Sequence, residues 1–170
     1  MKYLSAFLWS VLLIQTAAAQ DWSEVKVRLL PDSSFAVVET DALGRKHRHC
    51  PFREADGTVD MDQLIWVLGT LERHSWQDPA RAQEARQILE RHYQKAFRQL
   101  ADSEAPPIVD LNRATASQLV RLPGIGPVLA VRIIERRTSQ APFDTPQEIM
   151  QVEGIDRSKF AAIRHYIEIR

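Results

Sequence analysis

Apolar and polar residues alternate in two stretches near the start of the chain, at positions 25–30 and 35–40. Alternation with a period of two is typical of half-buried β-strands. The Pro, Asp and Ser residues at positions 31–34 favour a turn between the two stretches. We therefore predict a β-hairpin here, with a third strand near positions 47–52.

After position 60 the apolar spacing becomes helical. Leucines at positions 64, 68 and 71 predict a helix over 61–74, and a second helix over 79–100 follows Asp78, a residue type that caps helix N-termini. The second helix places one set of residues on a single side: Ala82, Ala85, Leu89, Tyr93, Ala96 and Leu100. We interpret the neighbouring aromatic residues as packing residues and not as a ligand-binding cage: Trp66, Trp76, Tyr93 and Phe97.

Two glycine-containing turns separate short helical patterns in the last third of the chain. The first is Leu-Pro-Gly-Ile-Gly-Pro at 122–127, and the second contains Val-Glu-Gly-Ile at 152–155. Pro123 stops the preceding helix, Gly124 and Gly126 permit a backbone that a Cβ resists, and Pro127 suits the first position of the next helix. Such a turn directs backbone N–H groups and the positive end of a helix dipole at one spot, where an anion can bind.

Two further patterns define the helices around these turns. Thr115 with Gln118, and Thr145 with Glu148, have the spacing of capping boxes. The apolar positions predict one shared core, which holds both turns in place: Leu119, Leu122, Val128, Val131, Ile134, Ile149, Phe160, Ile163 and Ile167.

Together these elements predict an α+β protein in two parts. We expect a small N-terminal domain of a β-hairpin plus helices at 20–102, a proline-containing linker at 103–108, and an all-α domain at 109–170. Residues 1–19 have a basic Lys2, an apolar stretch and Ala-Ala-Ala at 17–19, which predict a signal peptide cleaved before Gln20. The alternative is an uncleaved membrane anchor. Cleavage would leave an extracytoplasmic or periplasmic protein without a membrane span.

The motifs of the last third occur in the order of a known family. Val-Asp-Leu-Asn at 109–112, the turn at 122–127, Ala-Pro-Phe at 141–143, Glu-Gly-Ile at 153–155 and Tyr-Ile at 166–167 resemble the tandem helix-hairpin-helix domain of the ComEA family of competence DNA receptors. The resemblance covers 109–170 and implies binding of double-stranded DNA outside the cytoplasmic membrane. It implies sequence-independent binding, because phosphate contacts position a protein on DNA without reading bases.

The resemblance also implies a set of contact residues, in which turn amides hold phosphates and Arg or Lys side chains flank them. These are Gly124, Ile125, Gly126, Val128, Arg132, Arg136, Gly154, Ile155, Arg157, Lys159 and Arg164. The chain departs from the family pattern at two positions. Leu129 stands where a Lys is usual, and Asp156 stands where the second hairpin usually has Gly. A carboxylate beside a phosphate repels it, and Arg157 and Lys159 would offset that repulsion.

Charge gives a weak signal in the same direction. The whole chain has a formal net charge of +0, but 106–170 carries nine basic against seven acidic residues, and 20–105 carries twelve against fifteen. Zero net charge argues against strong DNA affinity of the whole chain. An alternative function is therefore an extracytoplasmic scaffold that uses the hairpin domain for protein contacts. The candidate partners are double-stranded DNA and, beyond it, the DNA-uptake machinery or another extracytoplasmic protein.

Other chemistry is poorly supported. The single Cys50 cannot form an internal disulfide, and with His47 and His49 it lacks the spacing of a metal site, so we expect a polar strand or turn there. Residues 54–60 resemble the middle of a calcium loop, but the first and last ligand positions hold Phe52 and Gln63. We expect no metal, no cofactor and no enzymatic activity, since catalytic motifs are missing.

Overall fold

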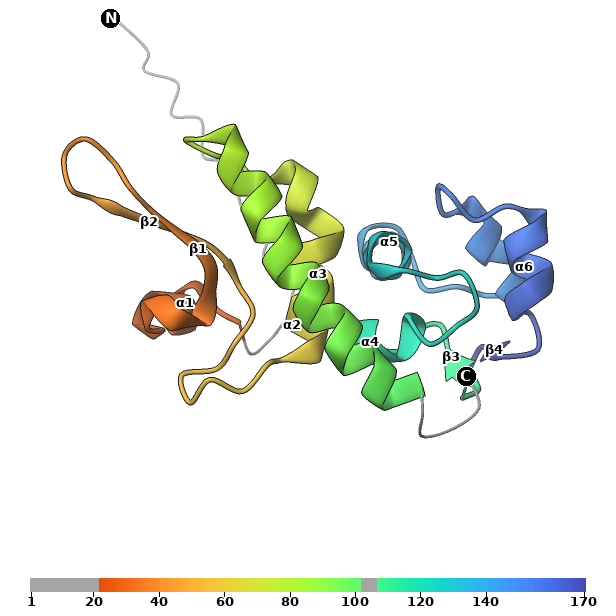
Figure 1. Cartoon of the computed structure of the whole chain (residues 1–170). Coiled ribbons are helices and arrows are strands. Elements are labelled where there is room, and N and C mark those ends of the chain that lie inside the picture. The colour runs from red at the N-terminus through yellow and green to blue at the C-terminus, as the bar shows by residue number, and fades with distance from the viewer. Residues whose placement is uncertain (1–21, 102–106) are drawn as a thin grey trace, which may run out of the picture.

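The computed structural model describes residues 22–101 and 107–170, and Figure 1 shows its α+β architecture. The predicted signal peptide at 1–19 and most of the predicted linker at 103–108 lie outside the described residues. Among the residues that are described, no helix has both the length and the apolar character needed to cross a membrane.

The first element is a short helix, α1 (Glu24–Leu29), where we predicted a strand at 25–30. Ser23 caps it, since its hydroxyl accepts a hydrogen bond from the N–H of Lys26 at 3.2 Å, and Glu24 lies in the positive first turn. The apolar residues that suggested a buried strand face do not face a core, because Val25 and Leu29 are 68% and 81% exposed. The strand prediction was wrong because local capping, and not alternation, decides this segment.

The predicted hairpin is instead formed by β1 (Phe35–Thr40) and β2 (Lys46–Pro51), which pair antiparallel. The segment expected as a third strand is thus the partner of β1, with Val37 opposite His49. The Asp41 carboxylate closes the turn by accepting hydrogen bonds from the N–H groups of Leu43 and Arg45, both at 2.9 Å. Hydrogen bonds from the backbone and side chain of Arg45 lower the pKa of Asp41 to about 2.

The two predicted helices are present: α2 (Met61–Thr70), continued by a 3-10 turn η2 (Leu71–Arg73), and α3 (Pro79–Ala101). Both pack against the hairpin. The Asp60 carboxylate caps α2 through the N–H of Gln63 at 2.9 Å. A short 3-10 turn, η1 (Asp32–Ser34), precedes β1. The helices and the hairpin share one core: Val37, Cys50, Phe52, Leu64, Val67, Leu68, Leu71, Ala85 and Leu89.

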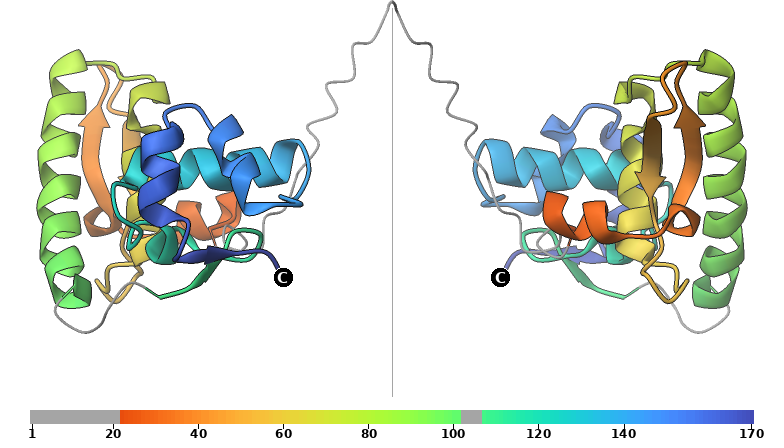
Figure 2. Two further views of the ribbon diagram at one scale, coloured as in Figure 1. Left: turned by 90° about the vertical axis from the view of Figure 1, so that its right-hand side faces the viewer. Right: turned by 90° about the vertical axis from the view of Figure 1, so that its left-hand side faces the viewer.

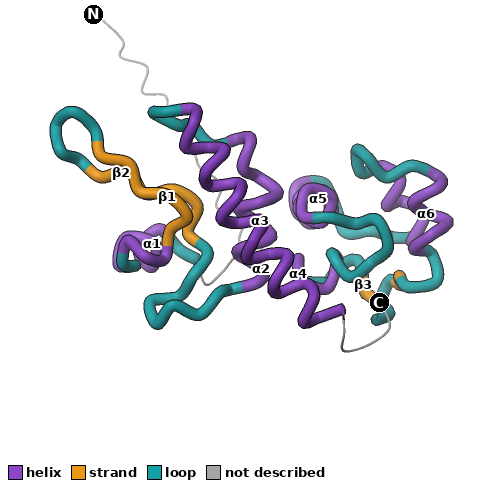
Figure 3. Tube along the Cα trace, viewed as in Figure 1, coloured by secondary structure: helices purple, strands orange, loops and turns teal. Residues whose placement is uncertain are grey.

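The C-terminal region contains α4 (Ala116–Leu119), α5 (Pro127–Ser139), η3 (Pro146–Gln151) and α6 (Arg157–Ile163). Two short strands, β3 (Val109–Asp110) and β4 (Ile167–Glu168), pair in parallel and bring its two ends together (Figure 3). Asn112 reinforces this closure, because its side chain both donates to the carbonyl of Phe143 and accepts from its N–H. The Val-Asp-Leu-Asn and Ala-Pro-Phe motifs therefore bind each other.

One of the two predicted capping boxes is confirmed. Thr115 and Gln118 bond reciprocally at the start of α4. Thr145 makes no such cap, because Pro146 begins a 3-10 turn and the Glu148 carboxylate accepts from the N–H of Asp144 instead, at 3.2 Å. The second capping box was therefore wrong, although the residues do begin a helical turn.

The predicted C-terminal core is buried except at two positions. Val128 is 47% exposed and Phe160 is partly buried. Val128 lies in the first turn of α5, next to Pro127, on the side of the helix away from the core. Its assignment to the core was wrong, and the residue belongs to the surface of the first turn.

The two regions of the chain pack directly against each other through α2. Ile65 of α2 lies in the C-terminal core, and the backbone at Gly69 approaches α5 so closely that a Cβ would come within 2.5 Å of Val131 Cγ2. Arg73 pairs with Glu135 of α5. Figure 2 shows α2 between the β-hairpin and the helices of the C-terminal region. The N-terminal region thus supports α5, the helix that follows the glycine-containing turn at 122–127.

Candidate functional site

The first hairpin, residues 122–127, is a tight turn whose shape is set by glycine. Gly124 has a φ of +73°, in the left-handed region, and the N–H of Ile125 donates to the carbonyl of Leu122 at 3.1 Å. The Ile125 side chain is buried in the core and anchors the turn from beneath. Gly126 is extended, with φ −96° and ψ −177°, and Pro127 begins α5. Backbone groups therefore form the outer surface of this hairpin.

The second hairpin, residues 152–157, repeats this backbone. Gly154 has a φ of +92°, the N–H of Ile155 donates to the carbonyl of Val152 at 3.0 Å, and Ile155 is buried. Asp156 occupies the position of Gly126 with nearly the same backbone angles, φ −88° and ψ 177°. Replacing Gly by Asp therefore leaves the turn intact, because this position does not need a positive φ.

The two hairpins differ in what occupies the N-terminus of the following helix. In the second, the Asp156 carboxylate accepts a hydrogen bond from the N–H of Lys159 at 2.7 Å and caps α6. In the first, Gly126 has no side chain to offer the N–H groups at the start of α5. These N–H groups and the positive end of the α5 dipole are open to an external anion.

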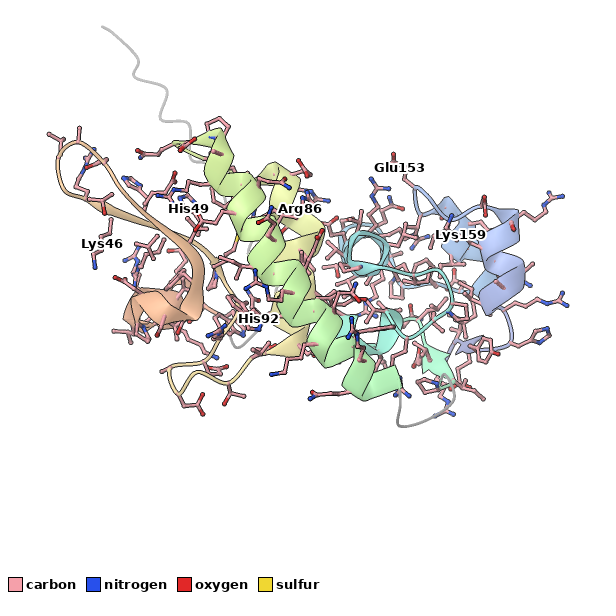
Figure 4. The ribbon with its side chains drawn as sticks, viewed as in Figure 1. Lys46, His49, Arg86, His92, Glu153 and Lys159 are labelled. Carbon is pink, nitrogen blue, oxygen red and sulfur yellow. The ribbon has the colours of Figure 1, made fainter. Side chains whose placement is uncertain are left out.

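The hairpins lie next to each other, with Arg132 between them. Its guanidinium donates to the carbonyl of Glu153 at 2.9 Å and lies 3.5 Å from the Glu153 carboxylate. A Cβ on Gly154 would come within 2.9 Å of Leu129 Cδ2 and 3.3 Å of the Arg132 guanidinium, so only Gly fits this contact without a shift. Figure 4 shows Glu153 and Lys159 on the part of the molecule that carries the second hairpin.

The structure separates the predicted basic residues into two kinds. Arg157 and Arg164 are exposed and Lys159 is partly exposed, so these cations can reach a ligand. Arg136 is only 11% exposed at its side chain, stacks on Phe143, and donates to the carbonyl of Ala141 and to Gln151. Arg136 is thus engaged in holding the 141–151 segment and is not presented to solvent.

Sequence reasoning missed the role of Arg137. This side chain donates to the carbonyls of Leu111 and Ala114, each at 2.7 Å, and fixes the entry to α4. Burial lowers the pKa of its guanidinium. Arg137 carries no sequence signal of this role, because its carbonyl partners lie 26 and 23 residues away and become neighbours only when the region folds.

The candidate ligands elsewhere in the chain are engaged in internal contacts. His47 lies 3.3 Å from Asp41, and His49 lies 2.7 Å from Glu39 and stacks on Trp76. Cys50 is buried, and burial raises the pKa of its thiol to about 12. Within the described parts of the chain, no group of three His, Cys, Asp or Glu side chains is arranged to hold a metal ion.

The 54–60 segment forms a small turn. Gly57 has a φ of +89°, and the N–H of Glu54 donates to the carbonyl of Thr58 at 2.8 Å. Asp60, at its end, caps α2.

Comparison with known proteins gives matches for the region that contains both hairpins. Residues 105–168 match the family model of the helix-hairpin-helix motif. The chain is 31% identical over 61 residues to Endonuclease/exonuclease/phosphatase family domain-containing protein 1 of Rattus norvegicus, and 30% identical over 61 residues to the Homo sapiens protein of that name. Each alignment covers 36% of this chain and 11% of the relative.

A bacterial relative is matched over a longer segment. ComE operon protein 1 of Bacillus subtilis (strain 168) is 31% identical over 70 residues, which cover 41% of this chain and 34% of that protein. The chain thus spans between about a tenth and a third of the length of these relatives. No solved structure is significantly similar. Residues 105–168 of this chain therefore match the helix-hairpin-helix motif, and the chain is similar to part of ComE operon protein 1.

Proposed function

We propose that this protein binds double-stranded DNA without sequence preference, and that the first hairpin holds the principal phosphate. The observation that carries the proposal is the open N-terminus of α5, where Gly126 leaves the backbone N–H groups without a side-chain cap. Arg157, Lys159 and Arg164 supply charge nearby, on the second half of the domain. Backbone amides and flanking cations contact phosphates, which carry no sequence information.

We further propose that the binding takes place outside the cytoplasm, in DNA uptake during competence. The similarity to ComE operon protein 1 supports this role. The apolar stretch and the alanines before Gln20 support export. Export is tested by expressing the full chain and identifying the N-terminal residue of the extracytoplasmic protein, which we expect to be Gln20.

We propose binding without catalysis. The match to Endonuclease/exonuclease/phosphatase family domain-containing protein 1 covers only 11% of that protein. Supercoiled plasmid incubated with the mature chain and Mg²⁺ should stay uncut, and time-dependent nicking that tracks the purified protein would contradict this.

The deciding experiment measures binding to a random-sequence duplex as a function of salt concentration. If about three to five phosphates are contacted, the logarithm of the binding constant should fall with the logarithm of salt at a slope of roughly −3 to −4.5. Salt-independent binding, or none at low salt, would overturn the phosphate mechanism.

The structure supplies a matched pair of variants for this experiment. Gly124 and Gly57 both have a positive φ and open space around the missing Cβ. Gly124→Ala and Gly57→Ala therefore meet the same backbone strain, about 1–2 kcal/mol. Only Gly124→Ala should weaken DNA binding, and equal affinities for both variants would exclude the first hairpin as the site.

A protein-binding scaffold is the second candidate function. It is favoured by the internal engagement of Arg136 and by the Asp156 carboxylate on the second hairpin. Under this alternative the protein would show no salt-dependent affinity for duplex DNA.

A further inference from the structure

A groove of about 250 Å³ lies between α3 and the beginning of α5, beside the first hairpin. From α3 it is lined by Arg86, Glu90, Tyr93 and Gln94, and from α5 by Pro127 and Val128. Figure 2 shows α3 standing across the end of α5 at which that helix begins, and Figure 4 labels Arg86 on α3. A phosphate backbone held at the start of α5 therefore passes close to α3.

The position of α3 beside the hairpin is fixed by packing. Tyr93 and Phe97 stack with ring centroids 5.5 Å apart, and both pack against the core of the C-terminal region. Contact of this kind holds the helix in one place relative to the first hairpin. Side chains on this flank of α3 are thus presented to the same ligand as the hairpin amides.

The charge on α3 changes along its length. Residues 79–90 contain both signs, and Glu90 lies 3.6 Å from Arg86 within the groove. Residues 91–101 contain Arg91, Lys95 and Arg98 and no acidic residue. Within the described residues, Lys95 and Arg98 make no ion pair, so the later half of α3 is a basic surface next to the hairpin.

Helix geometry places Arg98 near the groove and directs Lys95 away from it. Arg98 follows Gln94 by four residues and so lies on the same side of α3, one turn further on. Lys95 follows Gln94 by one residue and points about 100° further round, away from the groove. The two cations are both exposed and differ chiefly in direction.

We propose that α3 is a third contact surface for the duplex, in which Gln94 and Arg98 contact the phosphate backbone held by the first hairpin, while Glu90 weakens that contact. The proposal rests on the proposed DNA binding by the hairpin. The Glu90 carboxylate repels phosphate and engages one side of the Arg86 guanidinium, whose other side pairs with Glu72. The N-terminal region thereby sets the affinity of the hairpin domain to which it is attached.

The test compares Arg98→Gln and Lys95→Gln in the full mature chain, with a random-sequence duplex as the probe. Arg98→Gln should lower affinity roughly three- to tenfold at low salt and make the salt slope shallower by about one. Lys95→Gln, the matched control, should change affinity less than about twofold. Glu90→Gln should raise affinity by about two- to fivefold. All three positions are exposed, and urea midpoints check that each variant folds as the parent does.

Each result either supports or overturns the proposed role of α3. If the parent binds and Gly124→Ala abolishes binding, but Arg98→Gln and Lys95→Gln behave alike, the role of α3 is overturned and the hairpin function stands. If the parent itself shows no salt-dependent binding, the hairpin function fails, and the role of α3 fails with it. A selective loss in Arg98→Gln together with a gain in Glu90→Gln supports the third surface.

Discussion

The two hairpins share a backbone and differ in chemistry. Each has a glycine at positive φ, a buried isoleucine and an extended residue that begins the next helix. In the first hairpin that extended residue is Gly126, which leaves the helix N-terminus open, whereas in the second it is Asp156, which fills it. A turn can therefore keep its shape while losing the vacancy that an anion would use.

The hairpins also differ in their support. The helices around the first hairpin, α4 and α5, pack against α2 of the N-terminal region, while α6 packs chiefly against η3. Asp62 of α2 even accepts a hydrogen bond from the N–H of Ser117 in α4, at 2.6 Å. The first hairpin, whose helix N-terminus has no side-chain cap, is thus the one supported by α2. Such support is expected of a site whose geometry must be maintained without a ligand.

Giving the first hairpin the capping residue of the second should have the largest effect on DNA affinity. Gly126→Asp gives the first hairpin the carboxylate of the second, so DNA affinity should fall by about 10- to 100-fold, the equivalent of one charge-assisted hydrogen bond. Stability should rise by a few tenths of a kcal/mol, since Asp caps a helix better than Gly. Duplex binding and urea unfolding measure the two effects. Unchanged affinity would show that the open α5 terminus is not the phosphate site.

Disturbing the contact between α2 and α5 should affect the first hairpin more than the second. Gly69→Ala places a Cβ against Val131 and the carbonyl of Pro127, so the free energy of unfolding should fall by about 1–3 kcal/mol. Amide hydrogen exchange should accelerate more at Ile125 than at Ile155. Equal acceleration at both amides would mean that α2 stabilises the whole region evenly.

The basic residues should separate into structural and ligand-binding ones. Arg136→Gln should cost about 1–3 kcal/mol of stability, because it removes the guanidinium stacked on Phe143 and its hydrogen bonds to Ala141 and Gln151. It should leave the salt slope of DNA binding unchanged. Arg157→Gln should leave stability within about 0.5 kcal/mol and make the slope shallower by about one. A shallower salt slope for Arg136→Gln, with an unchanged slope for Arg157→Gln, would instead mean that Arg136 contacts the DNA.

Opening the second hairpin should have the smallest effect. Asp156→Gly removes the carboxylate that caps α6, so stability should fall by only a few tenths of a kcal/mol, while DNA affinity should rise about two- to fivefold. Fluorescence anisotropy with a labelled duplex resolves such a change. No gain would indicate that the second hairpin does not meet DNA.

Local sequence was sufficient wherever a few adjacent residues decide the structure. The helices α2 and α3, the turn at 122–127 and the capping box at Thr115 were predicted correctly. Local sequence misled at α1, where alternation suggested a strand, and at Val128, where an apolar residue proved exposed. The error at Val128 came from taking apolar character as burial, which depends on what lies opposite the residue. The error at α1 came from giving alternation more weight than the local cap at Ser23.

The candidate site was predictable only in its backbone. Gly124 and Gly154 were identified from the turn motifs, because the positive φ that favours glycine is a local property. The expectation that Gly126 also needs glycine was wrong, because its backbone is extended and a Cβ there would meet open space. The contacts of Arg136 and Arg137 were not predicted, since Gln151 lies 15 residues from Arg136, and Leu111 lies 26 residues from Arg137. Proximity of α3 to the first hairpin likewise depends on packing across the two regions.

The sequence by itself determined the two hairpin turns, the helices that flank them and the α+β class, because backbone conformation follows from the residues within one or two turns. Only the tertiary structure decided which cations remain exposed, that Arg137 holds the carbonyls of Leu111 and Ala114, and that α2 packs against the helices of the first hairpin. The physical reason is that charges and apolar faces acquire partners through space. A cationic side chain or a backbone N–H group can bind a ligand only if the folded protein leaves it exposed and without an internal partner.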